Sequence, residues 1–505
     1  MIGRTCSIAL AGLAGHVIDV EAHMAASLPS FSIVGLPDAS LSESRDRVRA
    51  AVTSSGLAWP TRRITVNLSP ASLPKSGSMT DLAIAVSVMA AAGMVDAHTA
   101  ARAVHLGELG LDGRVRPVRG VLPAVVAAVQ AGYPRVVVPA GNAREAQLVP
   151  GAQVLAVASL ADLARCYGNE EAEASSTDPV AALVVAMPPQ HELDLNEVRG
   201  QHEARWALEV AAAGGHHLLM MGPPGAGKTM LAARLPSILP DLSPTDAVAA
   251  TAVHSLAGTF DPERGLLSRP PFEAPHHSAS AASIVGGGSL MARPGAISRA
   301  HGGVLFLDEA PEFPSRVLQT LRQPLEAGEV VLHRAQGAAR YPARFQLVLA
   351  ANPCPCGRYF GTGADCSCTP MARRRYMGRL SGPLLDRIDL HVDVQPVRRD
   401  AEDKSESSAV VGERVREARG AMSERLSEHG WAVNSQANGV WLRANTPREV
   451  MRPVYAAMDR GALTARGVDR ALRVAWTLAD LGGAPAPSSD HVNQAMTLRT
   501  RAVAG

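Results

Sequence analysis

Aromatic side chains, lysines and long apolar runs are all scarce in this chain. Only 4% of its 505 residues are aromatic, which weakens any scheme of single-strand binding by base stacking. The formal net charge is only +2, so a nucleic-acid site would have to be a local basic patch. No run is long and apolar enough to span a bilayer, and residues 181–187 come closest. Because no signal peptide is convincing either, we expect a soluble cytoplasmic protein with no membrane partner.

Cysteine is scarce as well, but it is concentrated in one place. The chain has six cysteines, and four of them form two CxC pairs separated by nine residues. This spacing suits a metal site in a reducing compartment better than a disulfide framework. Because four thiolates match tetrahedral Zn²⁺, we predict a structural zinc on Cys354, Cys356, Cys366 and Cys368. The alternative is a loop with four reduced thiols, since CxC is tighter than the usual CxxC.

One glycine-rich stretch contains the motif around which the chain is organised. Residues 222–229 fit the pattern GxxxxGK[ST], between the apolar run 218–221 and a helical run that starts at Met230. Glycines there let backbone N–H groups close around a phosphate at a helix N-terminus. Lys228, one of only three lysines, would reach the outer phosphates, and Thr229 would hold Mg²⁺. The predicted ATP site is therefore Gly222, Pro223, Pro224, Gly225, Ala226, Gly227, Lys228 and Thr229.

Polar residues end two further apolar runs. Asp308 and Glu309 follow residues 303–307, and together with the upstream loop they predict a hydrolytic site. Asp308 would bind Mg²⁺, and Glu309 would be the base that activates the attacking water. Asn352 ends the run 345–351, where a neutral amide can orient the water without adding repulsive charge.

An arginine follows the tight turn that begins at residue 381. Arg387 could stabilise transition-state charge at the site of a neighbouring subunit, as an arginine finger does. A salt bridge to Asp386 or Asp389 is the simpler interpretation from the sequence alone.

These motifs resemble the YifB/ComM family of Mg-chelatase-like AAA+ ATPases, and the resemblance covers essentially the whole chain. It also rests on more specific segments, at residues 274–280, 285–288, 293–298, 300–309 and 352–357. The departures are small, with Ala296 where Glu is usual and Arg299 near a usual Leu. The resemblance implies hydrolysis of ATP with Mg²⁺ in a ring homo-oligomer, a hexamer. It further implies a motor on branched or single-stranded DNA that promotes branch migration, with helicase-like activity.

Two rival functions remain open at this point. One is a protein-remodelling or metal-insertion ATPase, as in the Mg-chelatase and MoxR-like relatives. The other is a non-catalytic scaffold that binds nucleotide only to assemble, and the full set of catalytic side chains argues against it.

The resemblance also implies roles for residues outside the phosphate loop. Arg466 corresponds to the second sensor arginine of the family's lid helix, with Thr464 as the helix cap and Arg470 as the alternative sensor. Residues 330–344 read as a hairpin at the ring's pore, and a solvated hairpin is an equally good interpretation. The candidate DNA contacts on it are Arg334, Arg340 and Arg344.

The N-terminal segment resembles the protease domain of Lon and its ChlI-type relatives. Its serine position holds Met79, and its lysine position falls near residues 122–124, which contain no lysine. A thioether cannot attack a carbonyl, so we do not expect peptidase activity. Ser76 or Ser78 could act only if the alignment of the motif is shifted.

The predicted fold class is α/β throughout, with a helical end. We assign residues 1–166 to the Lon-like domain, 167–190 to a linker, and 191–400 to a parallel-sheet AAA+ core that includes the cysteines. Residues 401–505 form a helical lid, with helices expected at 411–428, 450–480 and 490–501.

Overall fold

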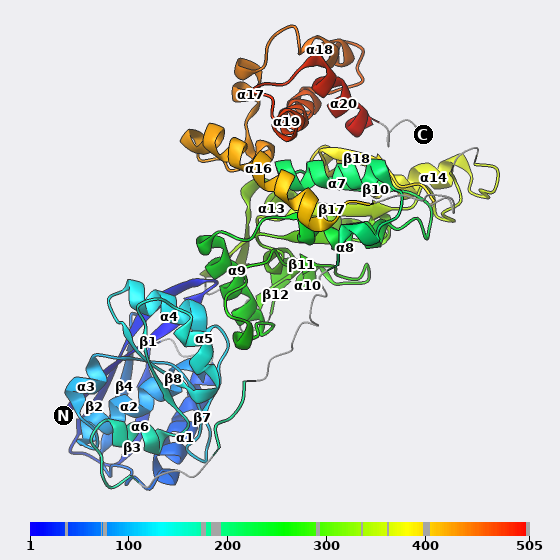
Figure 1. Ribbon diagram of the computed structural model, residues 1–505. Helices are drawn as coiled ribbons and strands as arrows, with labels where there is room; N and C mark the ends of the chain where they lie inside the picture. The colour runs from blue at the N-terminus through cyan, green and yellow to red at the C-terminus, as the bar shows by residue number, and fades with distance from the viewer. Residues whose placement is uncertain are drawn as a thin grey trace.

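The computed structural model describes most of the chain. The described ranges are 1–35, 39–71, 73, 78–172, 178–182, 193–288, 293–334, 337–360, 363–396 and 405–500. Figure 1 shows three parts in a row, namely an N-terminal α/β part, a central α/β part and a group of C-terminal helices. None of the described helices combines the length and the apolar character that a membrane span requires.

The N-terminal part is built on one mixed sheet. Its strand order is β3 (Ser30–Val34), β4 (Arg63–Ser69), β2 (Ala14–Ala25), β1 (Ile2–Ala11), β5 (Val104–His105), β8 (Arg135–Pro139) and β9 (Gln153–Val157). Helix α2 (Asp81–Ala92) is apolar on nearly every side and packs, fully covered, on β1 and β2. Helix α4 (Val121–Gln130) packs on the same strands in a second core cluster.

The two positions that would carry peptidase chemistry lie in that second core cluster. Met79 is buried, and it shares the cluster with Leu122 and Ala124. Ser78 donates its hydroxyl hydrogen to Glu108. Ser76, the other serine of the shifted alignment, falls outside the described residues. Apolar packing therefore occupies both positions.

The central part contains the parallel sheet that was predicted from the sequence. Its order is β11 (Phe272–Glu273), β14 (Val304–Leu307), β17 (Gln346–Ala351), β10 (Leu218–Met221) and β18 (Leu390–Asp393), and all neighbours are parallel. Strands β10 and β14 are apolar along their length, as buried strands are, and helices such as α7 (His202–Gly214) and α8 (Lys228–Ile238) pack in the same core. Parallel strands place all their carboxyl ends at one edge, where polar residues can meet.

The C-terminal helices share a core with this sheet. Helix α16 (Ser408–Leu426) packs on α7, α8 and α19 (Ala465–Leu481), and its buried side chains belong to the same cluster as those of β10. The expected helix over 450–480 is two helices, α18 (Arg452–Asp459) and α19, and Thr464 caps α19 by accepting from the N–H of Gly467. A short helix, α17 (Gly439–Asn445), precedes them, and α20 (Ser489–Thr500) follows.

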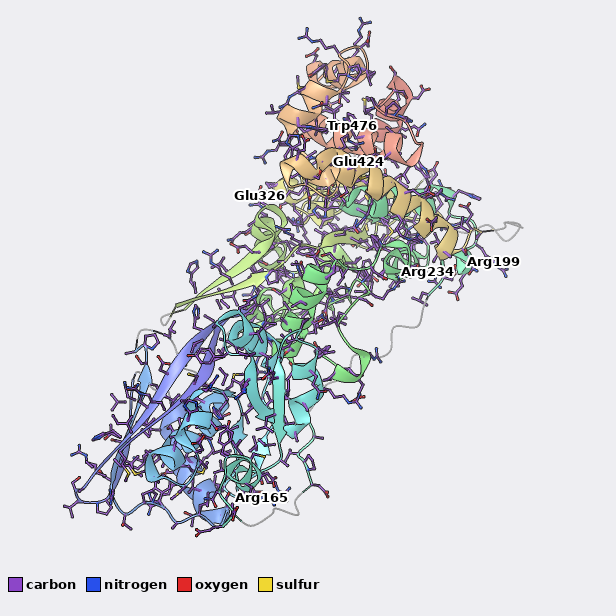
Figure 2. The ribbon with its side chains drawn as sticks, turned by 60° about the vertical axis from the view of Figure 1, so that its left-hand side comes forward. Arg165, Arg199, Arg234, Glu326, Glu424 and Trp476 are labelled. Atoms are coloured by element: carbon purple, nitrogen blue, oxygen red, sulfur yellow. The ribbon has the colours of Figure 1, made fainter. Side chains whose placement is uncertain are left out.

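Among the described residues, the N-terminal part touches the central part along α4 and α5 (Ala143–Gln147), where Arg144 pairs with Glu263, and at one hairpin. Helix α4 packs on α9 (Pro244–Ala257), where the Ser255 hydroxyl donates to the buried Glu145 carboxylate. The second contact is the hairpin of β15 (Glu329–Arg334) and β16 (Gly337–Pro342), which Figure 2 shows extending from the central part toward the N-terminal sheet. There the N–H of Leu13 donates to the carbonyl of Arg340 over 3.4 Å.

Candidate nucleotide site

The phosphate loop connects the end of β10 to the start of α8. Gly225 and Gly227 have left-handed backbones, with φ of 78° and 92°, which glycine adopts without steric cost. A Cβ on Gly222 would lie 2.2 Å from the carbonyl oxygen of Val394, so this position also requires glycine. The loop therefore presents backbone N–H groups at the N-terminus of α8, as an anion site does.

Lys228 is the first residue of α8, and its ammonium turns back across the loop. Its Nζ donates to the carbonyls of Gly222 at 2.7 Å and Pro223 at 3.0 Å, and to Oδ1 of Asn352 at 3.0 Å. Burial lowers the pKa of Lys228, and the carboxylates of Asp308 and Glu309 oppose that shift. Residues that follow three different strands are thus brought together, with Lys228 after β10, Asn352 after β17, and Asp308 and Glu309 after β14.

The hydroxyl and carboxylate predicted to hold Mg²⁺ lie side by side. Oγ1 of Thr229 donates to Oδ2 of Asp308 over 2.6 Å, and Oδ1 of Asp308 accepts from the N–H of Glu309 at 2.9 Å. Mg²⁺ prefers oxygen ligands and keeps several waters, so these two groups together with phosphate oxygens fit the ion.

Glu309 is held in an unusual conformation. Its φ is 49°, a left-handed value that is rare for a residue with a side chain. Its Oε2 lies 3.4 Å from Nδ1 of His277, and half of the glutamate side chain is exposed. His276 bonds to Ser278 instead, and within the described chain neither histidine belongs to a cluster of three metal-ligating groups.

Asn352 joins the site to the helix that follows the cysteines. Its backbone lies close enough to the buried Tyr376 of α14 (Pro370–Met377) to lower the pKa of that phenol, but burial outweighs this effect and raises the pKa to about 12. Tyr376 was not singled out in the sequence, because an aromatic residue in a basic helix carries no motif.

Arg387 precedes β18 and so lies at the amino edge of the central sheet, opposite the carboxyl edge where Lys228 and Asp308 lie. Its guanidinium donates to Glu326 and to the carbonyl of Pro383, while Asp389 pairs instead with Arg470 at 2.6 Å. Arg387 therefore forms a salt bridge, but with Glu326 and not with Asp386 or Asp389. Glu326, labelled in Figure 2, belongs to α13 (Arg322–Ala327). Arg466 is exposed in the first turn of α19.

The hairpin arginines have different environments. Arg340 pairs with Glu329 at 2.7 Å although its side chain is 67% exposed. Arg344 lies beyond the end of β16 and lines a cavity of about 830 Å³ at the amino edge of the sheet. Arg334 ends β15, and its side chain is outside the described residues.

The four clustered cysteines converge. All four Sγ atoms lie within 4.8 Å of one another, and no disulfide joins them. Cys354 is buried, and the other three are partly exposed.

Comparison with known proteins matches three segments of the chain to one protein family. Residues 194–402 match magnesium chelatase subunit ChlI, residues 20–142 match subunit ChlI of Mg-chelatase, and residues 405–499 match the C-terminal region of that subunit. Competence protein ComM of Haemophilus influenzae is 39% identical over 97% of this chain and 95% of its own length. The chain belongs to the Mg-chelatase-like YifB/ComM family of AAA+ ATPases.

Other relatives extend the comparison. YifB of Escherichia coli is 38% identical over 97% of this chain and 95% of its own length. A protein of Mycobacterium tuberculosis is 51% identical over 99% of this chain and 98% of its own length. The magnesium-chelatase 38 kDa subunit of Cereibacter sphaeroides is 26% identical over 59% of this chain and 88% of its own length. Membership in this ATPase family implies ATP and Mg²⁺, which fit the groups described above.

The structure also gives roles to two residues for which the sequence predicted none. Gln201, with φ of 56°, donates its amide to the carbonyl of Ala226 over 2.9 Å and so holds the phosphate loop from outside. Gly357 packs directly on Pro224 of that loop. Gln201 acts through its side-chain amide and Gly357 through its lack of a side chain, and neither role can be read from the residue type alone.

Proposed function

We propose that this protein is a ring-shaped ATPase that moves DNA strands, with one hydrolytic site at each subunit boundary. At each site Lys228 holds the outer phosphates, Thr229 and Asp308 hold Mg²⁺, Glu309 activates water, and Asn352 orients it. The observation that supports this assignment most directly is the convergence of Lys228, Thr229, Asp308 and Asn352 at the carboxyl edge of one sheet. The site then converts ATP and water to ADP and phosphate.

The position of Arg387 supports a ring. Strands β10 and β18 are paired in parallel, with Leu218 beside Leu390 and Met221 beside Asp393. Arg387 precedes β18, whereas Lys228 follows β10, so the two side chains lie at opposite edges. At about 3.3 Å per residue, a strand of this length separates the edges by roughly 10 Å. Arg387 therefore acts on the nucleotide of a neighbouring subunit, in a closed ring that we propose is a hexamer.

The second sensor remains assigned to Arg466. Arg470, its alternative, is committed to the carboxylate of Asp389 and to the carbonyl of Arg387. Arg466 is exposed and free of such a structural pair in the part of the chain that the structure describes.

DNA is the proposed substrate because of the competence-protein relative and because of local basic side chains. Arg374 and Arg375 are exposed on α14, next to the cysteine loop, while Arg334 is the last residue of β15 and Arg344 follows β16. Arg340 contributes less, since Glu329 already neutralises it. The alternative is a protein-remodelling or metal-insertion ATPase, which the similarity to a magnesium-chelatase subunit favours.

Two further parts complete the proposal. The buried Met79 and Leu122 support an N-terminal domain without peptidase activity. The converging thiolates support Zn²⁺ as a second cation on the cysteine cluster.

ATPase measurements with and without DNA test this function. We expect four-way or forked DNA to stimulate hydrolysis, with a stimulation that falls as salt rises. The variant Arg374→Ala/Arg375→Ala should lose most of the stimulation and keep the basal rate. Arg165→Ala, which removes an exposed arginine of the N-terminal part, is the matched control. A basal rate that no DNA changes, together with no salt-sensitive DNA binding, would contradict the DNA assignment.

A further inference from the structure

The cysteine cluster has the dimensions of a tetrahedral metal site. The Sγ of Cys354 lies 3.3 Å from that of Cys356 and 3.7 Å from that of Cys366, and the last two are 3.7 Å apart. A disulfide needs about 2.05 Å, so these sulfurs are not poised to pair covalently. A tetrahedron with metal–sulfur bonds of about 2.3 Å has edges of roughly 3.8 Å, which is close to the observed spacing.

The chemistry of the ligands selects the ion. Four thiolates are soft ligands that suit Zn²⁺ and exclude Mg²⁺, which requires oxygen ligands. The site is therefore chemically distinct from the cation site at Thr229 and Asp308, although both lie on the same side of the protein.

The first CxC pair holds a turn against the phosphate loop. The N–H of Gly357 donates to the carbonyl of Cys354 over 3.0 Å, which closes a turn around Cys356. Gly357 has φ of 74°, and a Cβ added there would lie 2.6 Å from Cδ and Cγ of Pro224. Pro224 is the third residue of the phosphate loop, so the turn and the loop are in direct contact.

The same segment also holds Asn352 and α14. Asn352 lies two residues before Cys354, and its amide oxygen accepts from Lys228. After Cys368, Thr369 caps α14, and the buried Tyr376 of that helix lies beside the backbone of Asn352. The guanidinium of Arg373 stacks over the ring of Tyr359 at 3.7 Å. A metal ion on the four cysteines would close the loop between these two anchor points.

We propose that Zn²⁺ bound by Cys354, Cys356, Cys366 and Cys368 braces the phosphate loop, through Gly357 on Pro224 and through Asn352 on Lys228. ATP turnover then depends on a second metal that never touches the nucleotide. This inference rests on the proposed ATPase function, and the cysteines act as positioning residues for it.

Metal analysis of the full-length protein, purified under reducing conditions, tests the site itself. We expect one Zn²⁺ per chain, and after exchange with Co²⁺ we expect the visible absorption of a tetrahedral tetrathiolate. Cys366→Ser should lose both signals, whereas Cys166→Ser, an exposed thiol in the N-terminal part, should keep them. A zinc content near zero, with no cobalt spectrum, overturns the metal site.

Kinetics of the same proteins test the brace. Cys366→Ser should bind ATP about tenfold more weakly or hydrolyse it about tenfold more slowly, in line with the usual effect of residues that support a site. Gly357→Ala should keep its zinc and lose ATP affinity, because the new methyl displaces Pro224. Gly265→Ala is the control, since its φ is 72° and a Cβ there meets nothing within 4 Å.

The outcomes separate the two proposals. Wild-type ATP affinity and turnover in both Cys366→Ser and Gly357→Ala would overturn the brace while leaving the ATPase intact. A wild-type protein that holds zinc and binds a fluorescent ATP analogue without hydrolysing ATP would overturn the proposed function and leave the metal site standing. Circular dichroism of each variant checks that a lost activity is not a lost fold.

Discussion

Glu309, the proposed catalytic base, has a left-handed backbone just after β14. A backbone held in this region costs of order 1–3 kcal/mol and persists only where the surroundings fix it. Here the N–H of Glu309 bonds to Asp308, and the carboxylate lies beside His277. These contacts differ for the two carboxylates, which fits our proposal that Asp308 serves the metal and Glu309 the water.

Replacing Glu309 with Gln should separate ATP binding from hydrolysis. The amide keeps the size and polarity of the side chain but cannot take a proton, so we expect turnover to fall by about 10²–10⁴-fold. Binding of a fluorescent ATP analogue should stay within a few fold of wild type. Glu417→Gln, an exposed change on α16, is the control. Hydrolysis that persists in Glu309→Gln would assign the base elsewhere.

For single residues, the sequence predicts those that belong to a known motif and misses those whose contacts depend on the tertiary fold. Lys228, Thr229, Asp308 and Asn352 are identified because their chemistry must follow particular strands. Gln201 is missed because a positive φ in a glutamine leaves no pattern. The partner of Arg387 is also missed: Glu326 lies far away along the chain, and only the tertiary fold brings it close.

The β15–β16 hairpin was predicted to lie at the ring's pore or to be a solvated hairpin. In the structure, residues of both strands pack where the N-terminal and central parts meet. Tyr341 and Ala339 form a small buried cluster with Leu256 of α9, and Leu10 and Leu13 lie against it. The tip of the β1–β2 turn, Gly12, is bridged to Arg340. The hairpin is thus in contact with both α9 and the β1–β2 turn.

Gly12→Ala should weaken this attachment. Gly12 has φ of 69°, and a Cβ there would lie 2.4 Å from the carbonyl oxygen of Arg340, so the two backbones must separate. We expect faster hydrogen exchange of backbone amides in residues 337–342, and a change in DNA-stimulated turnover. Gly132→Ala introduces the same left-handed strain, with φ of 87°, at a position that has nothing within 4 Å. Equal exchange in the two variants would show that the bridge does not hold the hairpin.

Sequence periodicity shows where helices occur, but it does not show where one helix ends and the next begins. The helical pattern over 450–480 is real, but the chain breaks between α18 and α19, where Thr464 supplies the cap that was recognised in isolation. Helix α17 was missed because its seven residues are too few for a periodic signal. Helix α16 was assigned to a separate lid, yet its apolar face completes the core of the ATPase sheet.

At the scale of the whole molecule, the two edges of the parallel sheet carry different halves of one proposed site. Lys228, Asp308 and Glu309 follow their strands at the carboxyl edge, whereas Arg387 precedes β18 at the amino edge. A single chain therefore carries all the groups of the proposed site, but its own Arg387 cannot reach its own Lys228, Asp308 and Glu309. This division follows from the parallel order of the strands, which the resemblance to AAA+ ATPases already implied.

Mixing two inactive variants tests whether the halves meet between subunits. In a ring of Lys228→Ala and Arg387→Ala chains, some boundaries join an intact phosphate loop to an intact arginine, so ATPase activity should return in part. Mixing Lys228→Ala with Glu309→Gln is the matched control, because both defects lie at the same edge of the sheet and every site stays incomplete. The measurement is turnover against mixing ratio at constant total protein. Recovery should be greatest near equal amounts in the first mixture and absent in the second. Equal recovery in both mixtures, or none in either despite ring assembly by light scattering, would show that Arg387 does not act across the boundary.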